Sequence, residues 1–269
     1  MRHRVPSSEF GVRRNKPQYW KLRTHYSQLL NPLLICLVLF FSPTLVSGQP
    51  APATEWNLLY PKIRDRLISR EEARAKLNVL EIQLRDNGSK YRRGGREEKL
   101  AFPLKGYTSH SIGGKGGSGY QPRGYDFFDG NDHRGHPGHD LFIFDKNQDG
   151  IDDKTGKPVE VISASPGIVV STNGGWQPSS PIRGGNYVWV FDPVTGRYFY
   201  YAHLEEIYVA VGQIISRGAT LATVGRTGLN ACPSRSPTHL HFTVHQSADG
   251  YPKPINPYRE LVGNRGPKG

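Results

Sequence analysis

The chain has 269 residues and a formal net charge of +12, which allows one mid-sized domain with short additional segments. Its 31 glycines and 21 prolines, together with many aromatic residues, favour short strands joined by turns over a helical fold. The basic residues are scattered and no nucleic-acid-binding signature accompanies them. The charge therefore argues against a nucleic-acid partner and fits either anionic envelope polymers or solubility alone.

Residues 1–48 have the pattern of an export signal. Seven basic residues precede the apolar run 33–41, which is short for a membrane span, and small residues follow at Val46, Ser47 and Gly48. The alternative is an uncleaved N-terminal anchor. In that case the N-terminal segment would be the only part of the chain that contacts a membrane. We expect export to the periplasm or cell envelope, and signal removal would leave Cys232 as a lone thiol, either incidental or a metal ligand.

Residues 49–101 are expected to hold a Pro/Ala-rich linker followed by a helical segment. A capping box runs from Ser69 to Glu72. Apolar residues then recur at helical spacing up to Leu84, and residues 86–88 are expected to end the helix. The helix is either an inhibitory or docking segment, or a packing and spacer element.

Residues 102–262 are expected to form a mainly antiparallel β domain, followed by a C-terminal tail at 263–269. Short apolar runs separated by turn residues predict the strands, and the turn at 192–196 predicts a hairpin. The glycine-rich loop 113–119 lacks the context of a phosphate loop. The predicted strands cover residues 102–108, 141–144, 159–163, 167–171, 187–191, 197–201, 212–215, 220–224 and 240–245.

Histidines and one aspartate form the candidate chemical site. On a strand, His239 and His241 would share one face, opposite an apolar face suited to a core. His136 and Asp140 lie four residues apart in a loop that enters a strand. Two imidazoles and a carboxylate suit one zinc ion with a position left open for water, whose pKa the metal lowers. Taken singly, each motif also fits an ordinary polar surface, as does His203 at the end of its strand.

The ordered motifs resemble the lysostaphin-like (LytM-type, M23) family of zinc endopeptidases over about residues 102–250. The resemblance rests on four motifs in the order of the family: His136-x-x-x-Asp140, the strand segment 167–170, the sequence around His203, and His239-x-His241. The resemblance implies that His136, Asp140 and His241 bind zinc. It also implies that His203 and His239 are catalytic, one helping to activate water and the other stabilising the oxyanion. The implied substrates are stem peptides or cross-links of bacterial peptidoglycan, or another peptide, cleaved by zinc-activated water.

The sequence departs from the family pattern in three places. His139 stands where the family often has an apolar residue. His133 and His245 add imidazoles; His245 shares the strand face of His241 and is interpreted as a surface residue, with a groove-lining role as the alternative. Residues 231–238 lengthen the approach to His239 and bear on substrate preference.

A second motif resembles the start of a calcium loop. Oxygen-bearing side chains at alternate positions lead to Gly150, but the twelfth position is Gly156 where a bidentate Glu is usual. The alternative is a solvated acidic turn. The candidate calcium ligands are Asp145, Asn147, Asp149 and Asp153.

Three functions remain in competition at this point. An exported cell-wall endopeptidase is favoured because all five site residues are present. A non-catalytic LytM-like domain that binds or activates another cell-wall hydrolase is the alternative. A calcium- or glycan-binding β module without zinc would leave the ordered histidines unexplained.

Overall fold

The computed structural model describes residues 51–89 and 99–263. The expected export signal or anchor at 1–48 lies outside these ranges. Within them, no helix combines the length and apolar character needed to cross a bilayer. All described residues belong to one unit, which spans residues 48–269.

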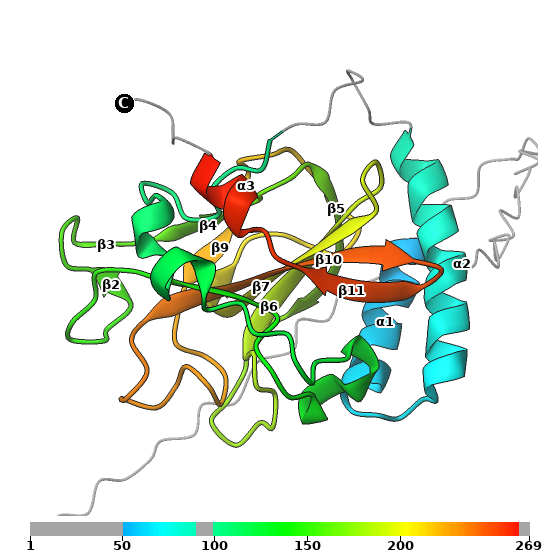
Figure 1. The fold of residues 1–269 in the computed structure, drawn as a ribbon, viewed down its shortest axis with the longest axis horizontal. Helices are drawn as coiled ribbons and strands as arrows, with labels where there is room; N and C mark the ends of the chain where they lie inside the picture. Colours follow the sequence, from blue (N-terminus) through cyan, green and yellow to red (C-terminus); the bar gives the residue numbers. More distant parts are fainter. Residues whose placement is uncertain (1–50, 90–98, 264–269) are drawn as a thin grey trace, which may run out of the picture. The chain divides into compact units, whose positions relative to one another are not determined.

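The centre of the fold is a nine-stranded sheet in which the described strands all pair antiparallel (Figure 1). Six strands follow the order β1-β10-β7-β6-β5-β8, while β11 pairs with β10, and β9 links β4 to β7. The expected mainly antiparallel β fold is thus confirmed. The strands are β1 Gly138–Phe142, β4 Glu160–Ile162, β5 Gly167–Asn173, β6 Asn186–Asp192, β7 Arg197–Ile207, β8 Ile214–Ile215, β9 Thr220–Val224, β10 His239–Ala248 and β11 Tyr251–Ile255, with β2 Ile151–Asp152 and β3 Lys157–Pro158 as a separate pair.

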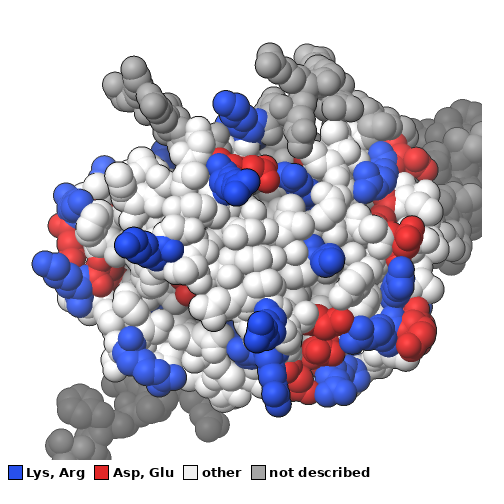
Figure 2. All heavy atoms as spheres, viewed as in Figure 1, with Lys and Arg blue, Asp and Glu red and all other residues white. Residues whose placement is uncertain are grey.

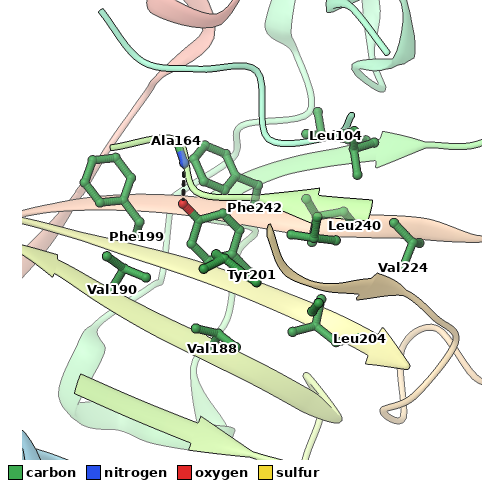
Figure 3. Packing of buried hydrophobic residues seen from close by; sticks show 14 of the residues in the cluster. Leu104, Ala164, Val188, Val190, Phe199, Tyr201, Leu204, Val224, Leu240 and Phe242 are labelled. Atoms are coloured by element: carbon green, nitrogen blue, oxygen red, sulfur yellow. Dashed lines mark hydrogen bonds between the residues drawn. The ribbon is translucent and has the colours of Figure 1, made fainter. Parts of the chain in front are cut away.

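The sheet separates two apolar cores because successive side chains of its strands point to opposite faces. Leu240, Phe242 and Val244 of β10 enter the first core. Figure 3 shows this core around Tyr201, whose hydroxyl accepts a 2.9 Å hydrogen bond from the backbone N–H of Ala164. His239 and His241 lie on the opposite face, as the alternation in the sequence predicts.

Two helices cover the second face of the sheet (Figure 1). Helix α2, Arg70–Ser89, begins at the predicted cap, where Ser69 Oγ accepts a 3.1 Å bond from the N–H of Glu72. Its buried hydrophobic residues are the predicted ones: Ala73, Leu77, Leu80 and Leu84.

Helix α1, Pro52–Arg64, occupies much of the segment expected to be a linker, and that expectation was wrong. Proline is tolerated in a first helical turn, and Trp56, Leu59 and Ile63 give the helix a buried face. Both helices share their core with β5, β6 and β7, so they form a layer of the same folded unit as the sheet.

Two further differences from the sequence prediction concern short elements. The segment 102–108 is not a strand; it contributes one isolated bridge, between Leu104 and Val161. Strand β11 and the short helix α3, Tyr258–Gly263, were not predicted, nor were the short 3₁₀ segments η1 Ser109–Ser111, η2 Lys115–Gly117 and η3 Phe127–Asp132.

Charged side chains are dispersed on the face shown in Figure 2. Lys and Arg alternate with Asp and Glu, most visibly beside the helices, and no broad expanse carries one sign. This face offers no basic stripe of the kind that follows a nucleic-acid backbone.

Candidate metal centre and active site

The fold brings the five predicted site residues together from four segments. Strands β1 and β10 pair in a register that sets Asp140 directly opposite His241. His136 lies two residues before β1, and His239 begins β10. His203 comes from β7, the neighbour of β10 on its other side.

Three side chains offer ligand atoms to a common point. Asp140 Oδ1 lies 2.9 Å from His241 Nδ1 and 3.1 Å from His136 Nε2, and the two nitrogens are 3.1 Å apart. Ligands in a tetrahedral zinc site at 2.0–2.1 Å from the ion lie about 3.3 Å apart. A small outward movement would therefore admit zinc. Within the described residues, His136, Asp140 and His241 are the only group of three or more His, Cys, Asp or Glu with this geometry.

Backbone carbonyls orient the rings of His136, His203 and His239. His136 Nδ1 lies 2.7 Å from Gly119 O, His203 Nδ1 lies 2.8 Å from Thr227 O, and His239 Nδ1 lies 2.7 Å from Pro237 O. A carbonyl can only accept, so each Nδ1 carries the proton. In neutral His203 and His239, Nε2 is then unprotonated and can accept a proton, whereas Nε2 of His136 donates to Asp140 and must lose its proton when a metal binds.

The electrostatics of the triad favour an ionised Asp140. Burial alone would raise the pKa of its carboxyl, but hydrogen bonds to His136 and His241 hold that pKa well below its usual range. Burial lowers the pKa of His241, although Asp140 opposes the effect. A deprotonated aspartate with a neutral imidazole is the protonation state that binds zinc.

His203 is held in a strained backbone conformation. Its φ is +65°, in the left-handed region, and it is the extra residue of a bulge: Ala202 and Leu204 both pair with β6, opposite Tyr187 and Asn186. Its N–H donates to Gly184 O, and its carbonyl accepts from the N–H of Gly225. Plain alternation from Tyr201 would send the imidazole of His203 to the face of the first core, and the bulge turns it toward the site instead.

His203 and His239 form a second pair of imidazoles beside the metal ligands. Their ring centroids are 4.9 Å apart, and His239 Nε2 lies 3.7 Å from Asp140 Oδ1. Both residues are buried, with 3% and 5% of their surface exposed. Burial, then the neighbouring His239 and His241, lowers the pKa of His203 to about 3. His203 is therefore neutral at pH 7.

A cavity of about 200 Å³ extends from these residues across the same face of the sheet. Aromatic residues form much of its wall, and α1 contributes Tyr60 and Arg64. Nothing in the sequence indicates this contribution, because α1 reaches the site only through tertiary packing. The other aromatic lining residues are Tyr125, Phe127, Trp189 and Tyr200.

The additional histidines have distinct surroundings. His245 is 1% exposed, lines the cavity and has Nε2 2.9 Å from Tyr125 Oη, so the interpretation as a surface residue was wrong. His133 also lines the cavity. His139 is fully buried on the other face of β1, with Nε2 2.9 Å from Asn256 Oδ1. Cys232 is an exposed free thiol.

The structure does not support calcium at residues 145–153. Asp145 accepts from the N–H groups of Asp149 and Gly150, Asp149 from Ile151, and Asp153 from Lys146. Among the described residues, the three carboxylates do not form a group able to hold a metal. Their oxygens cap the backbone of the loop, and Asn147 donates to Asp149.

Residues 146–257 match the sequence model of Peptidase family M23. This range contains His203, His239 and His241, whereas His136 and Asp140 precede it. A comparison with curated proteins finds no match. The match confirms the resemblance inferred from the motifs.

Several solved structures are similar to this chain. The catalytic domain of the antimicrobial peptidase lysostaphin from Staphylococcus simulans is 23% identical, covering 47% of this chain and 79% of that chain, with a TM-score of 0.34. A zinc-containing peptidase from Vibrio cholerae is 23% identical over 59% of this chain and 39% of that chain, with a TM-score of 0.37. A provisionally named glycyl-glycine endopeptidase, LytM, from Ruminococcus gnavus is 20% identical over 81% and 91%, with a TM-score of 0.43.

Proposed function

On the premise that the chain carries a domain of peptidase family M23, we propose that it is a zinc metalloendopeptidase that hydrolyses peptide bonds of bacterial peptidoglycan. The observation that carries the proposal is the convergence of His136, Asp140 and His241 on one point, with His203 and His239 beside it. Export to the cell envelope, expected from residues 1–48, agrees with such a substrate.

The donor set of the triad suits zinc. When bound, the ion supplies a Lewis acid that polarises a scissile carbonyl and lowers the pKa of a coordinated water. The protein orients and charges two of these ligands: Gly119 O fixes the ring of His136, and Asp140 is ionised opposite His241.

His203 and His239 are the groups placed to move protons and to stabilise charge. Each donates Nδ1–H to a backbone carbonyl and presents Nε2 to the site, so neither ring can rotate without losing a hydrogen bond. One accepts a proton from the attacking water, and the other stabilises the oxyanion. The completeness of the set supports an active enzyme over the non-catalytic LytM-like alternative.

The test combines bound zinc with release of amino groups from purified peptidoglycan. We expect about one zinc per chain, and His241→Ala to lose both zinc and activity. His203→Ala should keep zinc and lose about 10²–10⁴-fold in rate, the usual contribution of one general acid or base. Exposed His110 supplies the control, and His110→Ala should change neither.

Each outcome has a distinct meaning. Equal loss of zinc in the His203 and His241 variants would refute the assignment of roles. Zinc without cleavage of peptidoglycan would refute that substrate and call for other peptides. Neither zinc nor cleavage in zinc-supplemented buffer would favour the non-catalytic alternative.

A further inference from the structure

The cavity beside the triad is lined by more arginines than acids. Of the described residues that line it, Asp140 is the only acid, and Asp140 belongs to the triad. The lining also includes two arginines, Arg64 and Arg183. A cation without an acidic partner in a concave site attracts a ligand of the opposite sign.

The two arginines differ in their availability. Arg64 is already neutralised, because its Nη2 lies 2.6 Å from Asp65 Oδ2 and its Nε 2.8 Å from Asp65 Oδ1. Arg183 donates through Nη1 to two carbonyls, Asn131 O at 3.3 Å and His133 O at 2.8 Å. Within the described part of the chain it has no carboxylate partner. Its Nε and Nη2 donors are therefore available to a ligand.

The indole N–H of Trp189 is a second donor in the same cavity. Trp189 is 2% exposed and lines the cavity, and its N–H makes no hydrogen bond of good geometry among the described residues, although the side chain of Tyr60 packs edge-on against it and interacts with that N–H. A ligand oxygen that enters the cavity could accept from this N–H with better geometry than Tyr60 does. Tyr200 packs on Trp189 with ring centroids 4.5 Å apart, which gives the cavity an apolar wall around that donor.

The size of the cavity limits what can enter it. Its volume of about 200 Å³ is below the ~300–1,000 Å³ of clefts that hold drug-sized ligands. It suits one residue of a peptide whose neighbouring bond lies at the triad. Aromatic walls suit an aliphatic stem, and the unpaired guanidinium suits an anionic end.

We propose that this cavity is a substrate subsite for one residue that bears a carboxylate, with Arg183 as the cation that selects it. The proposal rests on the peptidase function proposed above. The carboxylate comes either from an acidic side chain or from the free carboxyl terminus of the peptide, which share the chemistry that Arg183 recognises.

Calorimetric titration of the zinc-loaded protein with three short peptides tests the proposal. Acetyl-Ala-Glu-Ala-amide carries a side-chain carboxylate, acetyl-Ala-Gln-Ala carries a terminal one, and acetyl-Ala-Gln-Ala-amide carries none. We expect at least one acidic peptide to bind about tenfold more tightly than the neutral peptide, as a charge-assisted hydrogen bond allows. Which of the two is preferred identifies the source of the carboxylate.

Variants separate Arg183 from the metal as the group that holds the carboxylate. In Arg183→Gln the acidic preference should fall to near one, while the affinity for the neutral peptide is retained. Arg183→Lys should keep part of the preference, which also covers the case in which the glutamine variant misfolds. Arg259, exposed on α3 and absent from the cavity lining, supplies the control, and Arg259→Gln should behave as the original protein.

Two results would overturn the subsite. One is equal binding of all three peptides by the original protein; the other is an acidic preference that survives in Arg183→Gln, which would place the carboxylate on the metal. The same titration separates this proposal from the peptidase itself. Acid-selective binding without hydrolysis of any peptide would refute the enzyme alone, and hydrolysis without acid selectivity would refute the subsite alone.

Discussion

The left-handed backbone at His203 predicts an unusual order of stability between two variants. His203→Ala and His203→Gly remove the same imidazole and the same hydrogen bond to Thr227, so their difference reports on the backbone. At φ +65° a residue with a Cβ is strained by about 1–2 kcal/mol, and glycine is not. Glycine also lowers the free energy of unfolding by about 0.4–1 kcal/mol relative to alanine, because it gives the unfolded chain more conformational freedom. The glycine variant should therefore be the more stable by about 0.5–1 kcal/mol.

Urea unfolding of the two zinc-loaded variants measures this difference. Thr172, the last residue but one of β5, supplies the matched comparison, because its φ is not positive. There Gly should be less stable than Ala by about 0.5–1 kcal/mol, the ordinary order in a strand. If glycine is also the less stable residue at position 203, the bulge does not hold a strained backbone, and the account of how His203 is aimed fails. Both His203 variants should retain zinc.

Three other predictions follow from the structure. Burial lowers the pKa of His245 from 6.5 to about 3, so protonation of His245 favours the unfolded chain. At pH 5 this protonation should reduce the free energy of unfolding by about 2 kcal/mol. Thermal melting between pH 6.5 and 4 should show a smaller loss of stability for His245→Gln than for the original protein. Thr238 donates a buried 2.6 Å bond to Asp145, so Thr238→Val should destabilise by about 1–3 kcal/mol and slow hydrolysis through its neighbour His239, with unchanged zinc. An unchanged rate would show that this bond does not position His239. A Cβ at Gly138 would lie 2.3 Å from Phe242 O, so Gly138→Ala should push β1 away from β10 and weaken zinc binding. Competition with a chelator measures the zinc affinity. An unchanged affinity would show that the strand pairing tolerates the methyl group.

The sequence alone predicted those parts of the site that depend on local periodicity. Alternation along β10 placed His239 and His241 on one face and Leu240 on the other, because a strand has a period of two whatever surrounds it. Helix α2 was predicted for a similar reason: its cap and its apolar spacing are both local. The order of the motifs then predicted which residues would converge.

The parts that failed depend on contacts distant in sequence. His245 was interpreted as exposed because nothing near it in the sequence shows that α1 and η3 cover its face of the sheet. Of the two interpretations of residues 145–153, the structure favours the acidic turn over calcium, because the oxygens of Asp145 and Asp149 bond the backbone of their own loop. The segment that forms helix α1 was predicted as a linker because prolines such as Pro52 and Pro61 usually indicate that a segment is not helical. The burial of Trp56 against the sheet explains why a helix forms there.

The helical layer bears directly on the chemistry, because without it the metal centre would lie on an open sheet. Helix α1 packs on β5, and its Tyr60 and Arg64 line the cavity that begins at the triad. Trp56 donates a 3.2 Å bond to Tyr198 Oη, and Tyr198 in turn donates a 3.1 Å bond to Glu81 of α2. These bonds tie both helices to β7, the strand that carries His203. The segment before the sheet is therefore a structural wall of the site, and the shape of the cavity depends on the helices as much as on the strands.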